Sequence, residues 1–432
     1  MTSVADRFFD LDPLRRPVRF SGGSEALLQL LPRLATGWSF REVPEAEDPS
    51  PLMVSLSGGR FQLTAPWQEE PVDESDPFRA AANLAVDLLE AYLDENPELL
   101  AIHCACAVLG DTAVLFPGSS RAGKSTLAVA LAATGFPVLG DDVLALSSER
   151  PPQAISLGMH PRLRLPLPEA ADAVFKQFVS DHTAAADDKY AFLGLPAGAG
   201  PAFGRRARLG AVVLLEREDR QDAKLVAVVP GDGLEKLMMQ QLSPGLSQAD
   251  ALPRLAAALE GTACYRLRYG DLANAVARLR AVFIDGEEIE AAPAPVEEVP
   301  GTSSPAPVGD GHRKFAIGLR FVRAPGVTRH GVDDEAFLTV GETGAVFRLN
   351  PISSALWNLV ENPMSIDLCT ALLADAFPEI DDRRIMADVD NHFAEMQRAG
   401  LIEVIGRVSD EPVSGEATTE AAEEARPPAP AD

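Results

Sequence analysis

Residues 112–135 read TAVLFPGSSRAGKSTLAVALAATG and carry the pattern GxxxxGK[ST] between Gly118 and Ser125, with every fixed position matched. The apolar run before the pattern predicts a strand, and the run rich in alanine and leucine after it predicts a helix. Glycines let the backbone amides of such a loop point at an anion, which also lies at the positive end of the helix. The stretch therefore predicts a phosphate-binding strand, loop and helix within an α/β domain.

The loop residues have distinct expected roles in binding a nucleotide. Lys124 is expected to contact the terminal phosphates, and the Ser125 hydroxyl is expected to bind magnesium. The alternative is a glycine-rich turn without a ligand. The candidate nucleotide-binding residues are Gly118, Ser119, Ser120, Arg121, Ala122, Gly123, Lys124, Ser125 and Thr126. These residues predict ATP and Mg²⁺ as cofactors, although many activities use such loops.

Two carboxylates follow the next apolar run. Residues 136–146 read FPVLGDDVLAL, which predicts a strand whose carboxyl end carries Asp141 and Asp142. Ligand crevices of open α/β sheets form at such ends. One carboxylate could hold magnesium while the other accepts the proton of an attacking hydroxyl. Alternatively, either aspartate could cap the backbone amides of a turn.

The stretch HCACAVLGDTAVLFPGSSRAGKSTLAVALAATGFPVLGDD, residues 103–142, resembles the core of the HPr serine kinase family. In that family a strand with a histidine precedes the phosphate loop and an aspartate pair follows it. The resemblance implies Lys124 on the phosphates and Asp141 as the base that deprotonates an acceptor serine. It leaves Ser125 and Asp142 as the magnesium ligands. His103 matches the family histidine near the phosphates, whereas a lone histidine in an apolar strand is more often structural.

The resemblance continues loosely to about residue 285. This longer region is similar to the smaller HPr-kinase-related proteins of peptide gene clusters. The long acidic helix motif of the bifunctional kinase/phosphorylases is not recognisable, which argues against reverse phosphorylase activity. Arg162, Arg164 and Lys189 could clamp phosphate or an acceptor loop, or could be solvated surface residues.

Composition and charge limit the class of protein. A chain of 432 residues with 46% hydrophobic residues predicts two or three folded domains. It has neither an apolar run of membrane length nor a basic, apolar N-terminal signal, so we expect a cytoplasmic protein without a membrane partner. The net charge of −26 argues against nucleic acid as a partner.

Two stretches rich in proline and acidic residues divide the chain. Residues 287–311 predict an extended linker and residues 407–432 a disordered tail. The remaining regions are an α+β N-terminal region, 1–98, packed on the kinase-like domain; an α/β phosphate-loop kinase-like domain, 99–286; and a small winged-helix-like α+β domain, 312–406.

Residues 318–348 predict three short strands (GLRFVRA, EAFLTVG and AVFRLN), with turns at Pro325, Gly326, Gly331 and Gly344. Three helices are predicted to follow. The stretches VFRLN, ALWNLVEN and DVDNHFAEMQRAGLIEV resemble the PqqD family of peptide chaperones. The resemblance implies that a leader peptide pairs with the edge strand and lies against the last helix. Winged helices also bind DNA, which stays an alternative.

Together these patterns predict an ATP-dependent kinase that phosphorylates a hydroxyl, most simply serine, of a ribosomally made peptide or small protein. The peptide would be recruited through residues 312–406. The alternatives are a non-catalytic peptide-binding scaffold switched by nucleotide, and a kinase acting on a small molecule. The sequence leaves open the acceptor's identity, which aspartate is the base, and whether the chain forms a homo-oligomer.

Overall fold

The computed structural model describes residues 6–119, 121–168, 171–218, 222–289, 314–316, 318–332, 335–341 and 343–407. The chain divides into two compact units: Met1–Leu246 with Ala257–Ala292, and Ser247–Ala256 with Pro293–Asp432. Most of the predicted linker and tail, residues 290–311 and 408–432, and also Ser120, lie outside the described residues.

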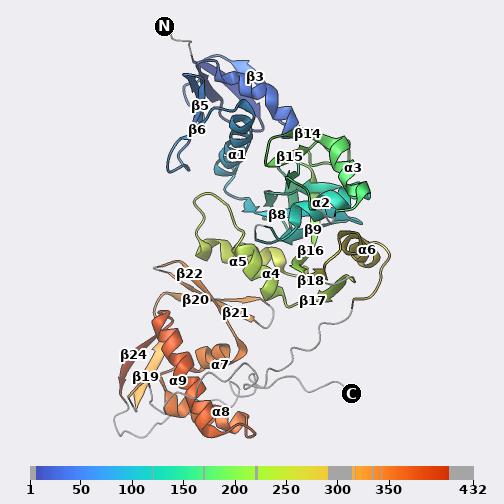
Figure 1. The fold of residues 1–432 in the computed structure, drawn as a ribbon. Coiled ribbons are helices and arrows are strands. Elements are labelled where there is room, and N and C mark those ends of the chain that lie inside the picture. Colours follow the sequence, from blue (N-terminus) through green and yellow to red (C-terminus); the bar gives the residue numbers. More distant parts are fainter. Residues whose placement is uncertain are drawn as a thin grey trace. The chain divides into compact units, whose positions relative to one another are not determined.

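The first unit begins with a six-stranded sheet in the order β3-β1-β2-β4-β5-β6. Its elements are β1 (Arg7–Asp12), β2 (Val18–Ser21), the 3₁₀ helix η1 (Ser24–Arg33), β3 (Ser39–Val43), β4 (Met53–Ser57), β5 (Arg60–Thr64), β6 (Val72–Glu74) and α1 (Pro77–Glu95). Figure 1 shows α1 beside β5 and β6. The apolar faces of η1 and α1 share one core with the sheet.

Local sequence signals explain this region well. Residues 52–66 (LMVSLSGGRFQLTAP) predict a hairpin with two glycines at its turn. The structure confirms it as β4 and β5, joined by Gly58 and Gly59, both of which have positive φ. Residues 78–95 carry apolar residues at helical spacing, and the helix that they predict is confirmed as α1. Asp76 caps it, because its carboxylate accepts hydrogen bonds from the amides of Phe78 and Arg79 at 2.8 and 2.9 Å.

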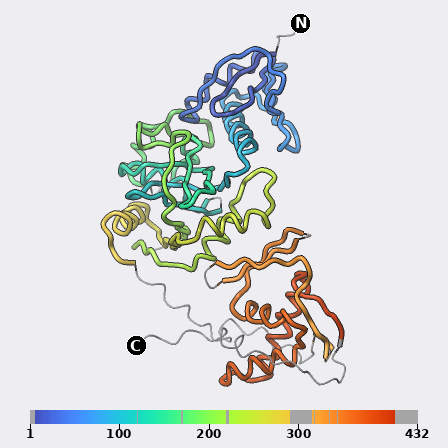
Figure 2. Tube along the Cα trace, turned by 180° about the vertical axis from the view of Figure 1, so that it is seen from behind, coloured from blue at the N-terminus to red at the C-terminus, as the bar shows by residue number. Residues whose placement is uncertain are grey.

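A nine-stranded mixed sheet follows, and Figure 2 traces the chain from the first sheet through α1 into it. Seven strands have the order β10-β8-β9-β16-β12-β11-β7, β18 also pairs with β16, and β17 pairs with β18. The strands of this sheet are β7 (Leu100–Ile102), β8 (Cys104–Leu109), β9 (Thr112–Pro117), β10 (Val138–Gly140), β11 (Leu144–Leu146), β12 (Gln153–Ser156), β16 (Arg206–Arg217), β17 (Lys224–Ala227) and β18 (Ala263–Tyr269). The other elements of the first unit are α2 (Lys124–Ala133), β13 (Arg162–Arg164), α3 (Ala173–His182), β14 (Thr183–Ala186), β15 (Tyr190–Leu193), α4 (Pro230–Met238) and α6 (Leu272–Phe283). Helix α5 (Gln248–Leu259) is divided between the two units.

Helices cover both faces of this sheet. Side chains of α2 and α6 share a core with Val213 of β16 and Leu267 of β18. On the opposite face Gly233 of α4 approaches β18 so closely that a Cβ there would lie 2.6 Å from Cys264 Sγ. Since successive strand residues point to opposite faces, the sheet is the middle layer of a mixed α/β arrangement.

Two apolar runs that each favour a single continuous strand are divided between two strands. The run LLAIHCACAVLG breaks at His103 into β7 and β8. The run FPVLGDDVLAL breaks at Asp141 and Asp142, so that β10 pairs with β8 whereas β11 pairs with β7 and β12. Apolar continuity could not reveal these breaks, because the strands on either side of each break are all buried.

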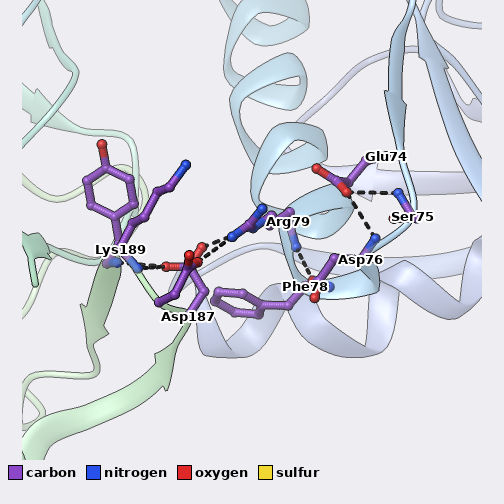
Figure 3. A network of polar contacts seen from close by, with 9 residues as sticks. Glu74, Ser75, Asp76, Phe78, Arg79, Asp187 and Lys189 are labelled. Carbon is purple, nitrogen blue, oxygen red and sulfur yellow. Dashed lines mark hydrogen bonds and ion pairs between the residues drawn. The ribbon is translucent and has the colours of Figure 1, made fainter.

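Polar contacts also join the N-terminal region to a separate three-stranded sheet of order β13-β15-β14. Figure 3 shows Arg79, in the first turn of α1, with its Nε 3.4 Å from the Asp187 carboxylate. Asp187 accepts the Lys189 amide at 2.8 Å and so orders the turn before β15. Phe192 of β15 belongs to the same core as η1 and α1. The two regions therefore share packing as well as polar contacts.

The second unit contains two small sheets, with the orders β23-β19-β24 and β20-β21-β22. Its elements are β19 (Leu319–Arg323), β20 (Val327–Val332), β21 (Glu335–Val340), β22 (Ala345–Leu349), α7 (Pro351–Leu359), β23 (Met364–Ser365), α8 (Ile366–Ala376), α9 (Asp382–Arg398) and β24 (Ile402–Arg407). The three predicted helices are confirmed as α7, α8 and α9. Asn350, Ser365 and Asp381 cap them, because each accepts a hydrogen bond from a backbone amide of the helix that follows.

The turn predicted at Gly331 is wrong, because Gly331 lies inside β20, a strand that the sequence analysis missed. Residues Val327 to Val332 pair with every residue of β21. This pairing overrides the local preference of glycine for turns. In the described parts of both units, no helix is long and apolar enough to cross a lipid bilayer.

We expect the two units to unfold separately, because each has its own core. Phe321 is fully buried in the second unit and makes edge-to-face contacts with Phe315 and Phe393. Phe321→Ala should destabilise that unit by about 3–5 kcal/mol. Scanning calorimetry should show one of two transitions moving to lower temperature, and Phe20→Ala in the first unit should move the other. A common shift of both transitions would contradict separate unfolding.

Candidate phosphate-binding site

The predicted loop lies between the end of β9 and the start of α2. Gly123 caps α2 with φ of +94°, in the left-handed region that favours glycine. It also has no room for a side chain, since a Cβ there would lie 2.6 Å from the Tyr269 hydroxyl oxygen. In the part of the chain that the structure describes, Arg121 is the only residue other than glycine with positive φ, at +69°. A left-handed arginine in the loop is a local strain of the kind that concentrates at functional sites.

Lys124 is buried at the start of α2, with 6% of its surface exposed. Its ammonium donates hydrogen bonds to the carbonyl oxygens of Gly118 and Ser119 at 2.6 and 3.1 Å. Burial lowers the pKa of Lys124, while the negative charges of Asp141 and Asp142 raise it. The ammonium thus lies inside the loop, between the loop carbonyls and the aspartate pair.

Strand register brings the remaining predicted residues to the same edge. β8 runs antiparallel between β9 and β10, with Cys104 opposite Pro117 and Cys106 opposite Gly140. The amino end of β8 therefore lies beside the carboxyl ends of both neighbours. His103, the loop and the aspartate pair all emerge there.

His103 is half-buried and is fixed at two points. Its amide donates to the Gln240 carbonyl at 2.7 Å, and its Nδ1 donates to the Asp142 carbonyl at 2.8 Å. Burial lowers the pKa of His103, and the nearby Lys124 charge lowers it further. A neutral ring that donates from Nδ1 leaves Nε2 as an acceptor.

Asp141 is a buried carboxyl with one satisfied oxygen. Its Oδ2 accepts the Arg162 amide at 3.0 Å, whereas Oδ1 has no hydrogen-bond partner among the described residues. Burial and the Asp142 charge raise the pKa of Asp141 to about 7, despite opposing effects of the Arg162 amide and the Ser125 hydroxyl. The carboxyl thus lies close to Ser125 and titrates near neutral pH.

Asp142 is partly exposed, and Arg162 holds it in place. Its Oδ2 lies 2.8 Å from the Arg162 guanidinium, which also lies over the Tyr190 ring at 4.7 Å from the centroid. Arg162 therefore contacts both aspartates, one through its amide and the other through its side chain. Arg164 also lies over Tyr190, at 5.9 Å. From the sequence Arg162 is expected to clamp phosphate or an acceptor loop, or to be a solvated surface residue, because the approach of β13 to the aspartates is not local in sequence.

The residues present fit a magnesium ion, which prefers oxygen ligands. Ser125 offers a hydroxyl and the aspartates offer carboxylates, and the unpartnered Oδ1 of Asp141 is a buried acceptor without a donor. Within the described ranges no three His, Cys, Asp or Glu side chains form a metal-binding group.

Cys104 and Cys106 are both buried beside the site, on β8. Burial raises the pKa of Cys104 to about 12 and that of Cys106 even more strongly from its ordinary value. Both thiols are therefore neutral near pH 7.

The structure also places residues at the loop that the sequence analysis did not select. Tyr269 and Arg217 lie next to Gly123, on β18 and β16. Their positions in the sequence could have identified them, because both residues end apolar strands and ligand sites form at such ends in α/β sheets.

Comparisons with known proteins give two similarities. A sequence model of the PqqD family, described as coenzyme PQQ synthesis protein D, matches residues 335–402. The structure is similar to that of the Hpr(Ser) kinase/phosphatase from Coxiella burnetii, with 14% identity over 43% of this chain and 93% of that chain and a TM-score of 0.23. No curated protein matches this chain. The two families named are those that the sequence resembles, but this level of structural similarity transfers no activity.

The raised pKa of Asp141 predicts how stability depends on pH in the absence of nucleotide and metal. The folded pKa of about 7 exceeds the ordinary value of 3.8, so the folded protein binds more protons than the unfolded chain between these values. Stability should be lost as pH rises through this range. Asp141→Asn removes the cost of ionising this buried carboxyl. The melting temperature of the variant minus that of wild type should therefore rise from pH 4 to 7 and stay constant above pH 7.

Thermal melts in EDTA would test this, with Asp142→Asn as the control. A difference between Asp141→Asn and wild type that stays constant over this pH range would show that Asp141 ionises normally.

Proposed function

We propose that this chain is an ATP-dependent kinase that phosphorylates a hydroxyl, most simply serine, of a ribosomally made peptide or small protein. The observation that carries the proposal is the convergence of the Lys124 loop with Asp141, a buried carboxyl whose Oδ1 is unpartnered among the described residues. A nucleotide phosphate site and a proton acceptor are the two parts that phosphoryl transfer requires.

The loop supplies positioning and charge in this proposal. Backbone amides of residues 118–126 hold the phosphate chain, and the Lys124 ammonium exchanges its carbonyl partners for phosphate oxygens. Ser125 and Asp142 would hold magnesium, which supplies charge neutralisation when bound. Asp142 is kept in place for this role by Arg162.

Asp141 acts as the base. It accepts the proton of the acceptor hydroxyl, whose oxygen forms a bond to the γ-phosphorus as the bond to the ADP oxygen breaks. A carboxyl whose pKa is about 7 is well matched to proton transfer near neutral pH. His103 fixes the aspartate turn through the Asp142 carbonyl and presents a neutral ring near the phosphates. A base whose pKa lies near neutral pH supports a catalytic kinase rather than a non-catalytic scaffold switched by nucleotide.

The C-terminal domain would recruit the peptide. The PqqD match covers β21, β22 and α7 to α9, and β22 is an edge strand of its sheet in the described residues. An extended peptide can add to such an edge through main-chain hydrogen bonds. The composition of residues 287–311 predicts a tether, which would raise the local concentration of the acceptor at the phosphate loop.

Labelled ATP and peptides encoded beside the gene would test the proposal, with mass spectrometry locating the phosphate. Lys124→Ala should remove nucleotide-dependent activity without unfolding the protein. Asp141→Asn should retain ATP binding and slow transfer by about 10²–10⁴-fold, because an amide keeps the shape but cannot accept the proton.

Full transfer by Asp141→Asn, with loss in Asp142→Asn, would assign the base to Asp142. Transfer to a small molecule alone would support the alternative acceptor.

Peptide binding at β22 can be tested with proline at two adjacent positions. Amides along an edge strand alternate between facing the neighbouring strand and facing outward, so one of Val346→Pro and Phe347→Pro removes an outward donor. We expect that variant to fold normally and to lose peptide affinity in calorimetry, while the other variant destabilises the sheet. Thr328→Pro and Arg329→Pro on the opposite edge, β20, are the matched controls.

Loss of peptide binding only through β20, or binding of duplex DNA without peptide, would contradict recruitment at β22.

A further inference from the structure

Three parallel strands end at the phosphate loop. β16 pairs in parallel with β9 and with β18, so the carboxyl ends of all three point the same way. β9 leads into the loop, β16 ends at Arg217 and β18 ends at Tyr269. Carboxyl ends of neighbouring parallel strands are where α/β sheets bind ligands.

Arg217 and Tyr269 are register partners and lie against Gly123. An ideal Cβ on Gly123 would lie 3.7 Å from Arg217 Cδ and 2.6 Å from the Tyr269 hydroxyl. Alternation along β16 places Arg217 on the same face as Val213, which packs with α2. The Arg217 stem therefore lies beside the first turn of α2, just before Lys124.

The Arg217 guanidinium is exposed and makes no ion pair with any residue that the structure describes. Its neighbours on the opposite face are paired: Glu216 contacts both Arg266 and Arg268. An unpaired cation beside a phosphate loop, in a chain with a net charge of −26, is available to a ligand.

The order of the strands places the aspartates on one side of the phosphate loop and Arg217 on the other. Along the edge lie β10 with the aspartates, β8 with His103, β9 with the loop, and then β16 and β18. The reacting end of a nucleotide faces Asp141 under the proposed function. The opposite direction along this edge leads across β9 to β16 and β18.

We propose that Arg217 binds the ribose and base of the nucleotide. A guanidinium stacks on aromatic faces and donates several hydrogen bonds in one plane, so it can hold a nucleoside without contacting the transferred phosphate. Tyr269 is buried beneath it and supports the position of both Arg217 and Gly123. The inference rests on the proposed function for its ATP site.

Calorimetry on the full-length protein with ATP, ADP and inorganic tripolyphosphate tests the inference. R217A should weaken the binding of ATP by about tenfold or more. The binding of ADP should weaken by a similar factor, because both ligands carry the nucleoside. It should leave tripolyphosphate binding within about twofold of wild type. R217K keeps the charge but not the planar group, and should bind ATP more tightly than R217A and less tightly than wild type.

R208A is the matched control. Arg208 is an exposed arginine at the opposite end of β16, beside Thr112 at the start of β9. This variant loses the same charge and should bind all three ligands like wild type. Thermal melts would verify that each variant is folded, and R217K provides the test if R217A is not.

Unchanged ATP binding by R217A and R217K would overturn this inference while leaving the proposed kinase standing. Equal weakening of ATP and tripolyphosphate, or equal weakening by R208A, would also overturn it, because the effect would then be one of phosphate contact or general charge. Failure of wild type to bind either ATP or tripolyphosphate would overturn the phosphate loop itself and this inference with it.

Discussion

The register of β8 against β9 and β10 is the constraint on which the candidate site depends. Cys104 lies opposite Pro117 and Cys106 opposite Gly140, so one antiparallel strand begins where its two neighbours end. A shift of one residue would turn every side chain of β8 to the other face and would move His103 away from the aspartate turn. Close packing of small buried residues on β8, where alanine and cysteine alternate, holds this register against α2.

The parts of the fold that the sequence predicts are those decided by neighbours along the chain. The loop before Lys124, the hairpin at Gly58 and the caps of α7, α8 and α9 follow from residue types at fixed spacing. The strand β20 could not be predicted in this way, because the residues VTRHGV have a glycine and a polar centre and become a strand through pairing with β21.

The candidate site also has residues that local sequence reveals and an environment that only distant strands create. Lys124, Asp141 and Asp142 are recognisable because their types and spacing belong to one strand, loop and helix unit. The environment that tunes Asp141 is not recognisable, since the Arg162 amide comes from β13 and the burial comes from the whole sheet. Arg217 and Tyr269 likewise reach Gly123 only because β16 and β18 lie in parallel beside β9.

The hydrogen bonds of Lys124 have a consequence for selectivity among anions. Because the ammonium already holds the carbonyl oxygens of Gly118 and Ser119, an incoming anion competes with the loop for the cation. A single phosphate ion can replace these two bonds but gains few others. Under the proposed function, a polyphosphate chain would replace them and would also reach the amides at the start of α2. On this proposal the internal hydrogen bonds of Lys124 favour polyphosphate ligands over single phosphate ions.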